Sequence, residues 1–199
     1  MTKQWTGAFM GLMAALAGAT ANGAAAFDLS PKAQAALARG EAYADVSPDP
    51  DGISGRVRAV IDIDASPERV WKIMTDCATA GKLMTNPASC KVLSGDQRRG
   101  WDVREHITRR NLIFPSVRIV FCSDYEPVSR IRFSLIEGDL KVEQGEWRLQ
   151  ALGGGKGTRV FYGNRLAVDW PVPKAMMREA LRKDTPKVLG NLRKACEGT

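Results

Sequence analysis

The sequence predicts an α+β fold, in which a curved antiparallel sheet carries one long helix across its inner face. Three features of the chain support this. Strands of alternating polarity fill most of residues 90–168, a long amphipathic segment spans residues 172–196, and the shorter helical segments precede the run of strands. Because strands and helices are segregated along the chain, we do not expect a parallel sheet of repeated βαβ units.

The first 26 residues have the pattern of a secretory signal peptide. Lys3 makes the tip positive, residues 4–26 carry no charge, and A-x-A triplets end at Ala21 and Ala26. Such a segment is typically cleaved after the small residues, here near Ala21 or Ala26. The alternative is an uncleaved membrane anchor, because the uncharged stretch is long enough to span a bilayer. We therefore expect a periplasmic or secreted protein.

The rest of the chain is long enough for one domain with its own core. We divide it into an N-terminal short helix and strand, residues 27–52, and a main domain, residues 53–199. Ser30 can cap the short helix, Pro31 occupies its first turn and Gly40 ends it.

A capped helix follows directly on a strand at residues 56–64. Hydrophobic and polar side chains alternate in that strand, which indicates that one face is buried. Ser66 can cap the helix and Pro67 takes its first position. A second, weaker helix is expected over residues 78–86, where Gly81 lowers the helix propensity.

The segments between this pair of helices and the final helix are predicted to be strands, because their connections carry the residues of tight turns. They span residues 90–93, 101–108, 116–125, 130–136, 141–151 and 158–168. The final helix, residues 172–196, has an apolar stripe, and Pro186 interrupts its backbone hydrogen bonding. A helix laid across a curved sheet leaves space that can hold a ligand.

The alternation along each strand predicts which side chains face that space. On the strand at residues 101–108, we expect Trp101 and Glu105 to face inward and Arg104 and His106 to face outward. The candidate ligand-binding residues of the whole chain are Trp101, Glu105, Phe121, Phe133, Trp147, Tyr162, Asn164, Met177 and Leu181. The apolar members would form the wall, while Glu105 or Asn164 would orient a polar end of the ligand.

Four polar residues are expected on this inward face: Glu105, Ser123, Tyr162 and Asn164. A buried carboxylate without a partner has a raised pKa and can act as an acid or a base. The alternative is that these groups lie near water at strand ends or pair with an arginine, because ionisable groups avoid uncompensated burial.

The sequence offers no catalytic residue, no cofactor site and no metal site that we would assign. His106 is the only histidine, and no serine or aspartate pattern accompanies it. The glycine-rich residues 153–158 lack the phosphate-loop pattern and precede no helix, so they favour a hairpin turn. The cysteine spacing contains no C-x-x-C pair, which argues against zinc or an iron–sulfur cluster.

The motif order resembles that of the START-like (SRPBCC) superfamily, which includes the polyketide cyclase/dehydrase and coenzyme Q-binding groups. IDIDASPERVW (residues 61–71) is similar to its "I-x-A-P-x-x-V-W" opening, and GEWRL (145–149) and TRVFY (158–162) resemble its later strands. The resemblance covers residues 53–197. It implies a helix-grip fold with a deep cavity and usually a hydrophobic ligand, and it implies no shared catalytic residue.

Four cysteines remain to be placed, and an oxidising compartment permits disulfides. Cys77 follows the predicted helix end and Cys90 lies in the next strand, so a bridge between them would tie the two elements together. The alternative is a pair of buried free thiols, which pack well as small apolar groups. Cys122 lies on the face opposite Phe121 and is poorly placed to reach Cys196; the pairing of these two cysteines stays open.

The chain is basic, with a formal net charge of +7. Basic residues gather near the C-terminus, at Lys174, Arg178, Arg182, Lys183, Lys187, Arg193 and Lys194. Such a patch can meet nucleic acid or an anionic membrane, and export argues against nucleic acid. The alternative is a solvated helix face.

These observations favour an exported, non-catalytic binder or carrier of a hydrophobic small molecule, such as a lipid, a quinone or a polyketide-like compound. One alternative is an enzyme, a cyclase, dehydratase or hydrolase that uses the same cavity. Another is an envelope protein whose basic final helix docks on anionic lipid. Nothing in the sequence indicates an oligomeric state.

Overall fold

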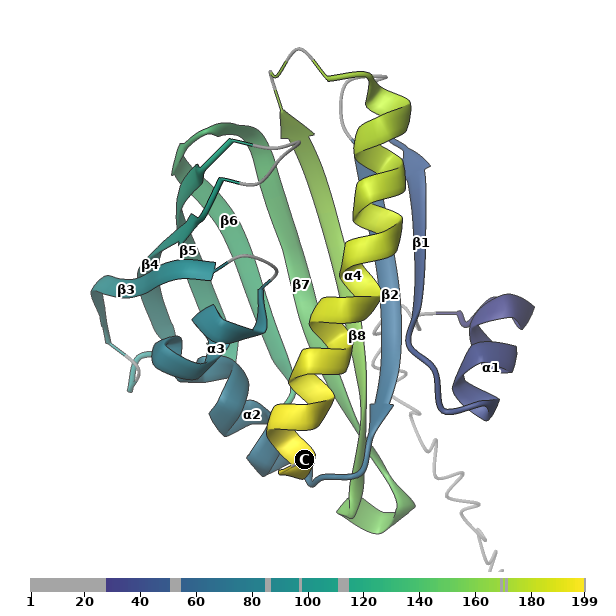
Figure 1. Cartoon of the computed structure of the whole chain (residues 1–199). Helices are drawn as coiled ribbons and strands as arrows, with labels where there is room; N and C mark the ends of the chain where they lie inside the picture. Colours follow the sequence, from purple (N-terminus) through teal and green to yellow (C-terminus); the bar gives the residue numbers. More distant parts are fainter. Residues whose placement is uncertain are drawn as a thin grey trace, which may run out of the picture.

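The computed structural model describes residues 28–50, 55–84, 87–96, 98–110, 115–168, 170 and 172–198. In this part of the chain, one antiparallel sheet of eight strands curves around a long helix, α4 (Lys174–Glu197), as Figure 1 shows. The predicted α+β class is confirmed. The predicted signal peptide lies outside the described residues. No described helix has the length and hydropathy that crossing a membrane requires.

The sheet is built from strands that pair with their neighbours throughout. They are β1 (Tyr43–Pro48), β2 (Gly55–Ile63), β3 (Pro87–Asp96), β4 (Trp101–Thr108), β5 (Val117–Glu126), β6 (Arg130–Gly138), β7 (Leu140–Leu152) and β8 (Gly157–Val168). Their order in the sheet is β1-β2-β8-β7-β6-β5-β4-β3. The meander from β3 to β8 therefore ends beside β2, and Ile61 pairs with Val160.

The described residues also form three shorter α-helices, α1 (Pro31–Ala38), α2 (Pro67–Thr75) and α3 (Cys77–Leu83). The helices cover different faces of the sheet. Ile61 and Val160 belong to the main core with residues of α2 and α4. Their neighbours Val60 and Phe161 face the other way and pack with Ala33 of α1. Alternate side chains of β2 and β8 therefore pack against helices on the two opposite faces of the sheet.

The start of α2 follows the predicted chemistry. The Ser66 hydroxyl accepts a hydrogen bond from the Arg69 backbone N–H at 3.4 Å, and Pro67 takes the first helical position. The helix ends at Thr75, so Cys77 begins α3 and does not continue the face of α2. Asp76 separates the two helices, and its carboxylate accepts a hydrogen bond from the Thr79 hydroxyl at 2.6 Å.

The two halves of α4 have different surroundings. In the C-terminal half, Leu189, Leu192 and Cys196 are buried in the main core with Val70 and Met74 of α2. Met177 and Leu181 in the N-terminal half are only partly buried. The packed end of the helix fixes its position, and the other end leaves a space over the sheet.

Candidate functional site

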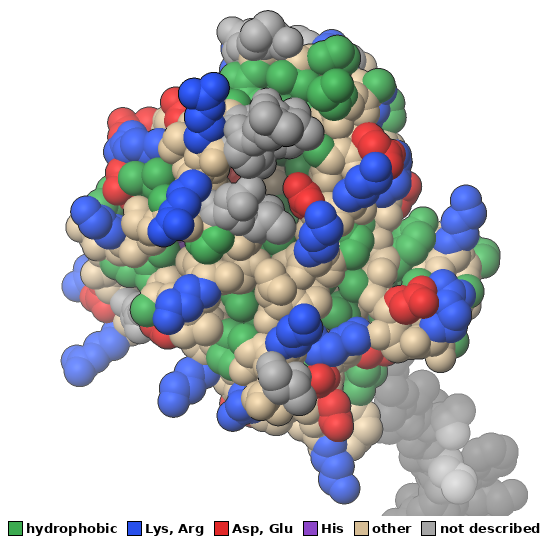
Figure 2. Space-filling view, viewed as in Figure 1, with side chains coloured by type: hydrophobic (Ala, Val, Ile, Leu, Met, Phe, Trp, Pro, Cys, Tyr) green, Lys and Arg blue, Asp and Glu red, His purple; other side chains and the backbone are tan. Residues whose placement is uncertain are grey.

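A cavity of about 410 Å³ lies between the N-terminal half of α4, the end of α3 and the concave face of β4 to β8. This volume is in the range of small-molecule sites. Leu83 and Met84 close one side of it, and Met177, Leu181 and Val188 form the helix side. Hydrophobic side chains also gather on the surface where α4 begins (Figure 2). The separation of helix and sheet expected from the sequence is therefore present.

A row of aromatic rings crosses the floor of the cavity. His106 on β4 meets Phe121 edge-on, with ring centroids 4.8 Å apart. Phe121 lies 6.4 Å from Phe133, and Phe133 stacks on Tyr162 at 6.2 Å. Trp147 packs on Tyr162 at 4.2 Å. The row brings together side chains from β4, β5, β6, β7 and β8, and it offers ring faces and edges to an apolar ligand.

Gly145 makes this close packing possible. A Cβ atom at this position would lie 2.7 Å from Cζ of Phe133 and 2.9 Å from Cα of Asn164. The missing side chain lets Phe133 approach β7. The glycine of the GEWRL stretch therefore shapes the floor of the cavity.

Most of the predicted ligand-binding residues line this cavity: Phe121, Phe133, Trp147, Tyr162, Asn164, Met177 and Leu181. Ser123, predicted on the same face, lines it as well. The expected facing of β4 is wrong. Trp101 and Glu105 lie on the opposite face of the strand, whereas Arg104 and His106 line the cavity.

The register of β4 explains this reversal. Arg104 pairs with Phe121 and His106 with Ile119, and paired residues of neighbouring strands share a face. Glu105 therefore points away from the cavity, where its carboxylate accepts a hydrogen bond from Arg118 Nε at 2.6 Å. The prediction failed because the outward face of β4 carries Trp101 and other apolar residues, a pattern that is typical of a buried face.

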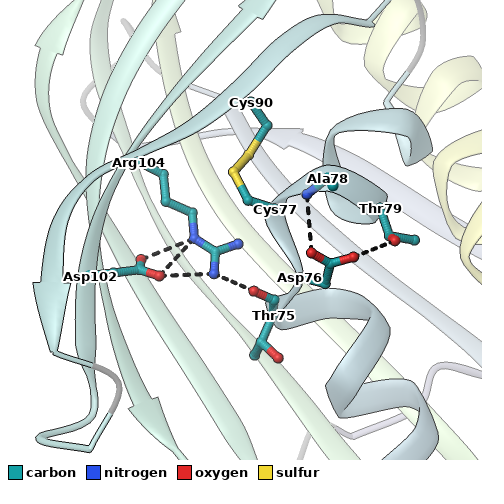
Figure 3. The surroundings of a disulfide bond; sticks show 8 residues. All are labelled: Thr75, Asp76, Cys77, Ala78, Thr79, Cys90, Asp102 and Arg104. Carbon is teal, nitrogen blue, oxygen red and sulfur yellow. Dashed lines mark hydrogen bonds and ion pairs between the residues drawn. A yellow bond between two sulfur atoms is a disulfide. The ribbon is translucent and has the colours of Figure 1, made fainter.

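A buried ion pair occupies the inner face of β4. Asp102 and Arg104 are 0% and 3% exposed, and both carboxylate oxygens of Asp102 accept from Arg104 Nε, at 3.0 and 2.9 Å. The same guanidinium donates to the Thr75 carbonyl oxygen at the end of α2 (Figure 3). Polar residues point inward here because they satisfy one another and a helix end.

The predicted disulfide between Cys77 and Cys90 is present, with Cα atoms 5.7 Å apart. It joins the start of α3 to β3, close to the ion pair of β4 (Figure 3). Cys122 and Cys196 are free thiols. The ring of His106 lies near the two bridged sulfurs, and the bond between them removes both thiolates as metal ligands.

Close packing against the disulfide explains the glycine at position 81 in α3. A Cβ atom there would lie 2.8 Å from Cβ of Cys90, so only glycine lets α3 rest on the disulfide. The last residue of α3, Leu83, is tied to α4, because its carbonyl oxygen accepts a hydrogen bond from Asn191 Nδ2 at 3.1 Å. Both ends of this short helix are therefore anchored.

A group of polar side chains lies among the aromatic rings on β7 and β8. Asn164 Nδ2 donates to the Tyr162 hydroxyl oxygen at 2.8 Å, and Glu143 lines the cavity beside them. Burial raises the pKa of Glu143 to about 7, an effect that the Asn164 side chain partly offsets. Burial also raises the pKa of Tyr162, and the charge of Glu143 adds to this. Glu143 was not predicted, although it shares the alternation of Trp147.

His106 is another titratable group in the cavity wall. Burial, followed by the positive charge of Arg104, lowers the pKa of His106 to about 4, while Asp102 acts in the opposite direction. Its Nε2 atom is buried and has no hydrogen-bond partner among the described residues. The imidazole is therefore neutral near pH 7 and forms a T-shaped contact with the Phe121 ring.

Several basic residues of α4 form hydrogen bonds or ion pairs within the fold. Arg182 donates to the Val46 carbonyl oxygen at 3.1 Å, and Arg193 donates to the Gly40 carbonyl oxygen at 2.7 Å. Lys187 pairs with Asp184 one turn away. Lys and Arg side chains nevertheless spread over the face that carries α4 (Figure 2).

The curved sheet, the covering helix and the cavity between them define a helix-grip fold of the START-like class. The chain belongs to the family described as polyketide cyclase/dehydrase and lipid transport, whose model matches residues 63–193. No curated protein sequence matches significantly.

Solved structures share the fold at low sequence identity. A START superfamily protein from Mycobacterium smegmatis is 18% identical, with a TM-score of 0.61, over 72% of this chain and 97% of that one. A STAR-related lipid transfer protein from Xanthomonas axonopodis is 14% identical, with a TM-score of 0.63, over 77% and 98%. The Zhui aromatase/cyclase from Streptomyces sp. R1128 is 15% identical, with a TM-score of 0.59, over 73% and 92%.

Proposed function

We propose that this protein is an exported carrier or binder of a hydrophobic small molecule, such as a lipid, a quinone or a polyketide-like compound. The observation that carries the proposal is the cavity of about 410 Å³ between α4 and the sheet, lined by aromatic and aliphatic side chains. A preformed apolar hollow gains free energy when an apolar ligand replaces water in it. The ligand would lie on the aromatic floor, beneath Met177 and Leu181.

The similar proteins support the class of ligand. The family description includes lipid transport, and the Xanthomonas relative is named a lipid transfer protein. The Streptomyces relative is named an aromatase/cyclase. These names favour a lipid or a compound that forms rings as the ligand.

Two observations support export. The first 26 residues have the composition of a signal peptide. The disulfide between Cys77 and Cys90 is typical of an oxidising compartment, because cytosolic thiols are kept reduced. A carrier in the periplasm or outside the cell would shield its cargo from water.

Native mass spectrometry of protein purified from its own compartment without detergent tests this function. We expect a mass increment from an apolar compound that is released on denaturation. The same preparation should bind the neutral fluorescent probe N-phenyl-1-naphthylamine, and the released compound should displace it. A spectrum of ligand-free protein that also fails to bind the probe would contradict the proposal.

An enzyme remains the second candidate because of one feature. Glu143, with its pKa near 7, lies in the cavity close to the Tyr162 hydroxyl, and a carboxyl with such a pKa can transfer protons. If the protein turns over a compound that it binds, Glu143→Gln should abolish turnover and retain binding. Glu105, the carboxylate that the sequence predicted to face the cavity, lies outside it and should be dispensable.

Contact with an anionic membrane is a further candidate, favoured by the start of α4. Met176 is half exposed there, and Lys174 and Arg178 lie two residues before and after it on the same helix. An exposed apolar side chain on a basic helix suits an anionic lipid surface. Salt-sensitive binding to vesicles containing phosphatidylglycerol, abolished by charge reversal at Arg178 and Lys183, would support it.

A further inference from the structure

We propose that Asn164, Glu143 and Tyr162 form a hydrogen-bonding subsite for a hydroxyl group, so that the cavity selects neutral hydroxyl-bearing ligands over anionic ones. This inference rests on the proposed function, because it names the ligand class for the same cavity. The subsite lies at one end of the aromatic row, where Tyr162 contacts both Phe133 and Trp147.

Two buried oxygen atoms in the cavity wall lack a hydrogen-bond partner within the described part of the chain. Asn164 is 7% exposed and lines the cavity, yet its Oδ1 atom has no hydrogen-bond partner among the described residues. Glu143 Oε2 is in the same situation. Buried polar atoms in native proteins nearly always have a partner. Two such atoms in one cavity wall indicate a group that enters the cavity to meet them.

The chemistry of the three side chains identifies that group. Asn164 Oδ1 and a Glu143 carboxylate oxygen both accept hydrogen bonds. Tyr162 accepts from Asn164 Nδ2, so its own hydroxyl proton can be donated. A ligand hydroxyl does both things at once, because it donates one hydrogen bond and accepts others. An alcohol or a phenol therefore matches the subsite better than an ether, which cannot donate.

The charges around the cavity argue against an anionic head group. Arg104 is the buried guanidinium in the wall, and Asp102 and the Thr75 carbonyl oxygen already engage it. Arg109 also lines the cavity but is exposed at its edge. Glu143 and Asp184 add negative charge when ionised. A carboxylate or phosphate in the interior would meet a neighbouring carboxylate and no unengaged buried cation among the described lining residues.

Three naphthalenes of similar size test the proposal: 2-naphthol, 2-methoxynaphthalene and 2-naphthoate, titrated at pH 7 with fluorescence detection. We expect wild-type protein to bind 2-naphthol roughly tenfold more tightly than 2-methoxynaphthalene, which is the ratio that one net hydrogen bond supplies. We expect 2-naphthoate to bind most weakly. Asn164→Leu should remove the preference for 2-naphthol while keeping the affinity for 2-methoxynaphthalene.

Glu143→Gln provides a second test that does not depend on Asn164→Leu folding. At pH 8.5, where a carboxyl with a pKa of about 7 is almost fully ionised, the substitution removes a negative charge and keeps the shape, so 2-naphthoate should bind roughly tenfold more tightly than it does to wild type, a change that about 1.4 kcal/mol produces. Glu105→Gln is the matched control. Glu105 lies on the other face of the sheet, so this substitution should leave all three affinities unchanged.

Equal binding of the three compounds, or no effect of Glu143→Gln, would overturn the subsite alone. Failure of all three to bind wild type would overturn the proposed function as well.

Discussion

Arg104 on β4 donates a hydrogen bond from Nη2 to the main-chain carbonyl oxygen of Thr75, the last residue of α2, at 2.5 Å. The last carbonyl groups of a helix lack partners within the helix, and they lie at the negative end of its dipole. A buried arginine thus holds the end of α2 against the sheet. Asp102 balances its charge from the same strand. The position of α3, which covers one side of the cavity, depends on this junction.

Removal of the arginine should destabilise the fold strongly. In Arg104→Met, Asp102 remains buried without its partner and the Thr75 carbonyl oxygen loses its donor. Breaking such a buried pair costs about 3–5 kcal/mol. Urea denaturation should show this loss. Arg118→Met is the control, because the Arg118 side chain is 42% exposed and its pair with Glu105 lies partly in solvent, where such a pair is worth about 1 kcal/mol or less. Equal losses for the two variants would refute the role of the junction.

Two glycines in helices should respond to alanine with opposite signs. A Cβ atom added at Gly190 in α4 would meet no described atom within 4 Å, so Gly190→Ala should stabilise by up to about 1 kcal/mol through helix propensity. Gly81 in α3 rests on Cys90, so Gly81→Ala should destabilise in spite of the same gain. Thermal unfolding of both variants measures the signs. A stabilising Gly81→Ala would show that α3 does not rest on the disulfide.

Much of the fold was predictable because its signals are local. Ser66 and Pro67 mark the start of α2 through cap chemistry that involves only neighbouring residues. The strands of residues 116–168 show their inward face by alternation, since one face is apolar. The prediction of the Cys77–Cys90 bridge also needed only the end of one helix and the strand after it.

The facing of β4 was not predictable in the same way. Its inner face is polar because Asp102 and Arg104 satisfy each other and Thr75, a residue far away in sequence. Only the register with β5 reveals this arrangement, and alternation carries no register. Glu143 is a different case. It lies four residues before Trp147, so alternation places both side chains on the same face of the strand. We did not predict it there because a carboxylate is not expected on an inward face.

The single histidine permits a direct test of the cavity wall. The proton NMR signal of His106 should titrate near pH 4, because its pKa lies well below the ordinary value of 6.5. Since the folded-state pKa lies below the unfolded one, the unfolded chain binds the proton first as the pH falls. Stability should therefore decrease from pH 6.5 toward pH 4, by about 3 kcal/mol from this group.

His106→Phe should weaken this acid dependence, since phenylalanine does not titrate. The comparison with wild type in the same buffers cancels the contribution of the carboxylates. An NMR titration midpoint near 6.5 would mean that the imidazole is accessible to water and does not form part of a buried wall.

Glu143 should have the opposite pH dependence. Its folded-state pKa, about 7, lies above the ordinary value of 4.5, so the folded protein holds the proton more tightly than the unfolded chain. The contribution to stability is full below pH 4.5 and is lost as the pH rises to 7. Glu143→Gln removes this loss, so its free energy of unfolding relative to wild type should increase by about 3 kcal/mol between about pH 4.5 and 8. A difference that does not change with pH would show that the carboxyl is solvated.

If the space under the first half of α4 holds an apolar ligand, two tryptophan substitutions on that helix should have different effects on binding. Ala180 lines the cavity, whereas Ala175 on the same helix is exposed. Tryptophan at position 180 should occupy the space, and tryptophan at position 175 should not.

The measurement is the dissociation constant of N-phenyl-1-naphthylamine for Ala180→Trp, Ala175→Trp and wild type, with circular dichroism to confirm folding. We expect at least roughly tenfold weaker binding by Ala180→Trp alone, the loss that removing about 1.4 kcal/mol of apolar contact produces. Wild-type affinity in folded Ala180→Trp would show that the ligand does not lie under the first half of α4.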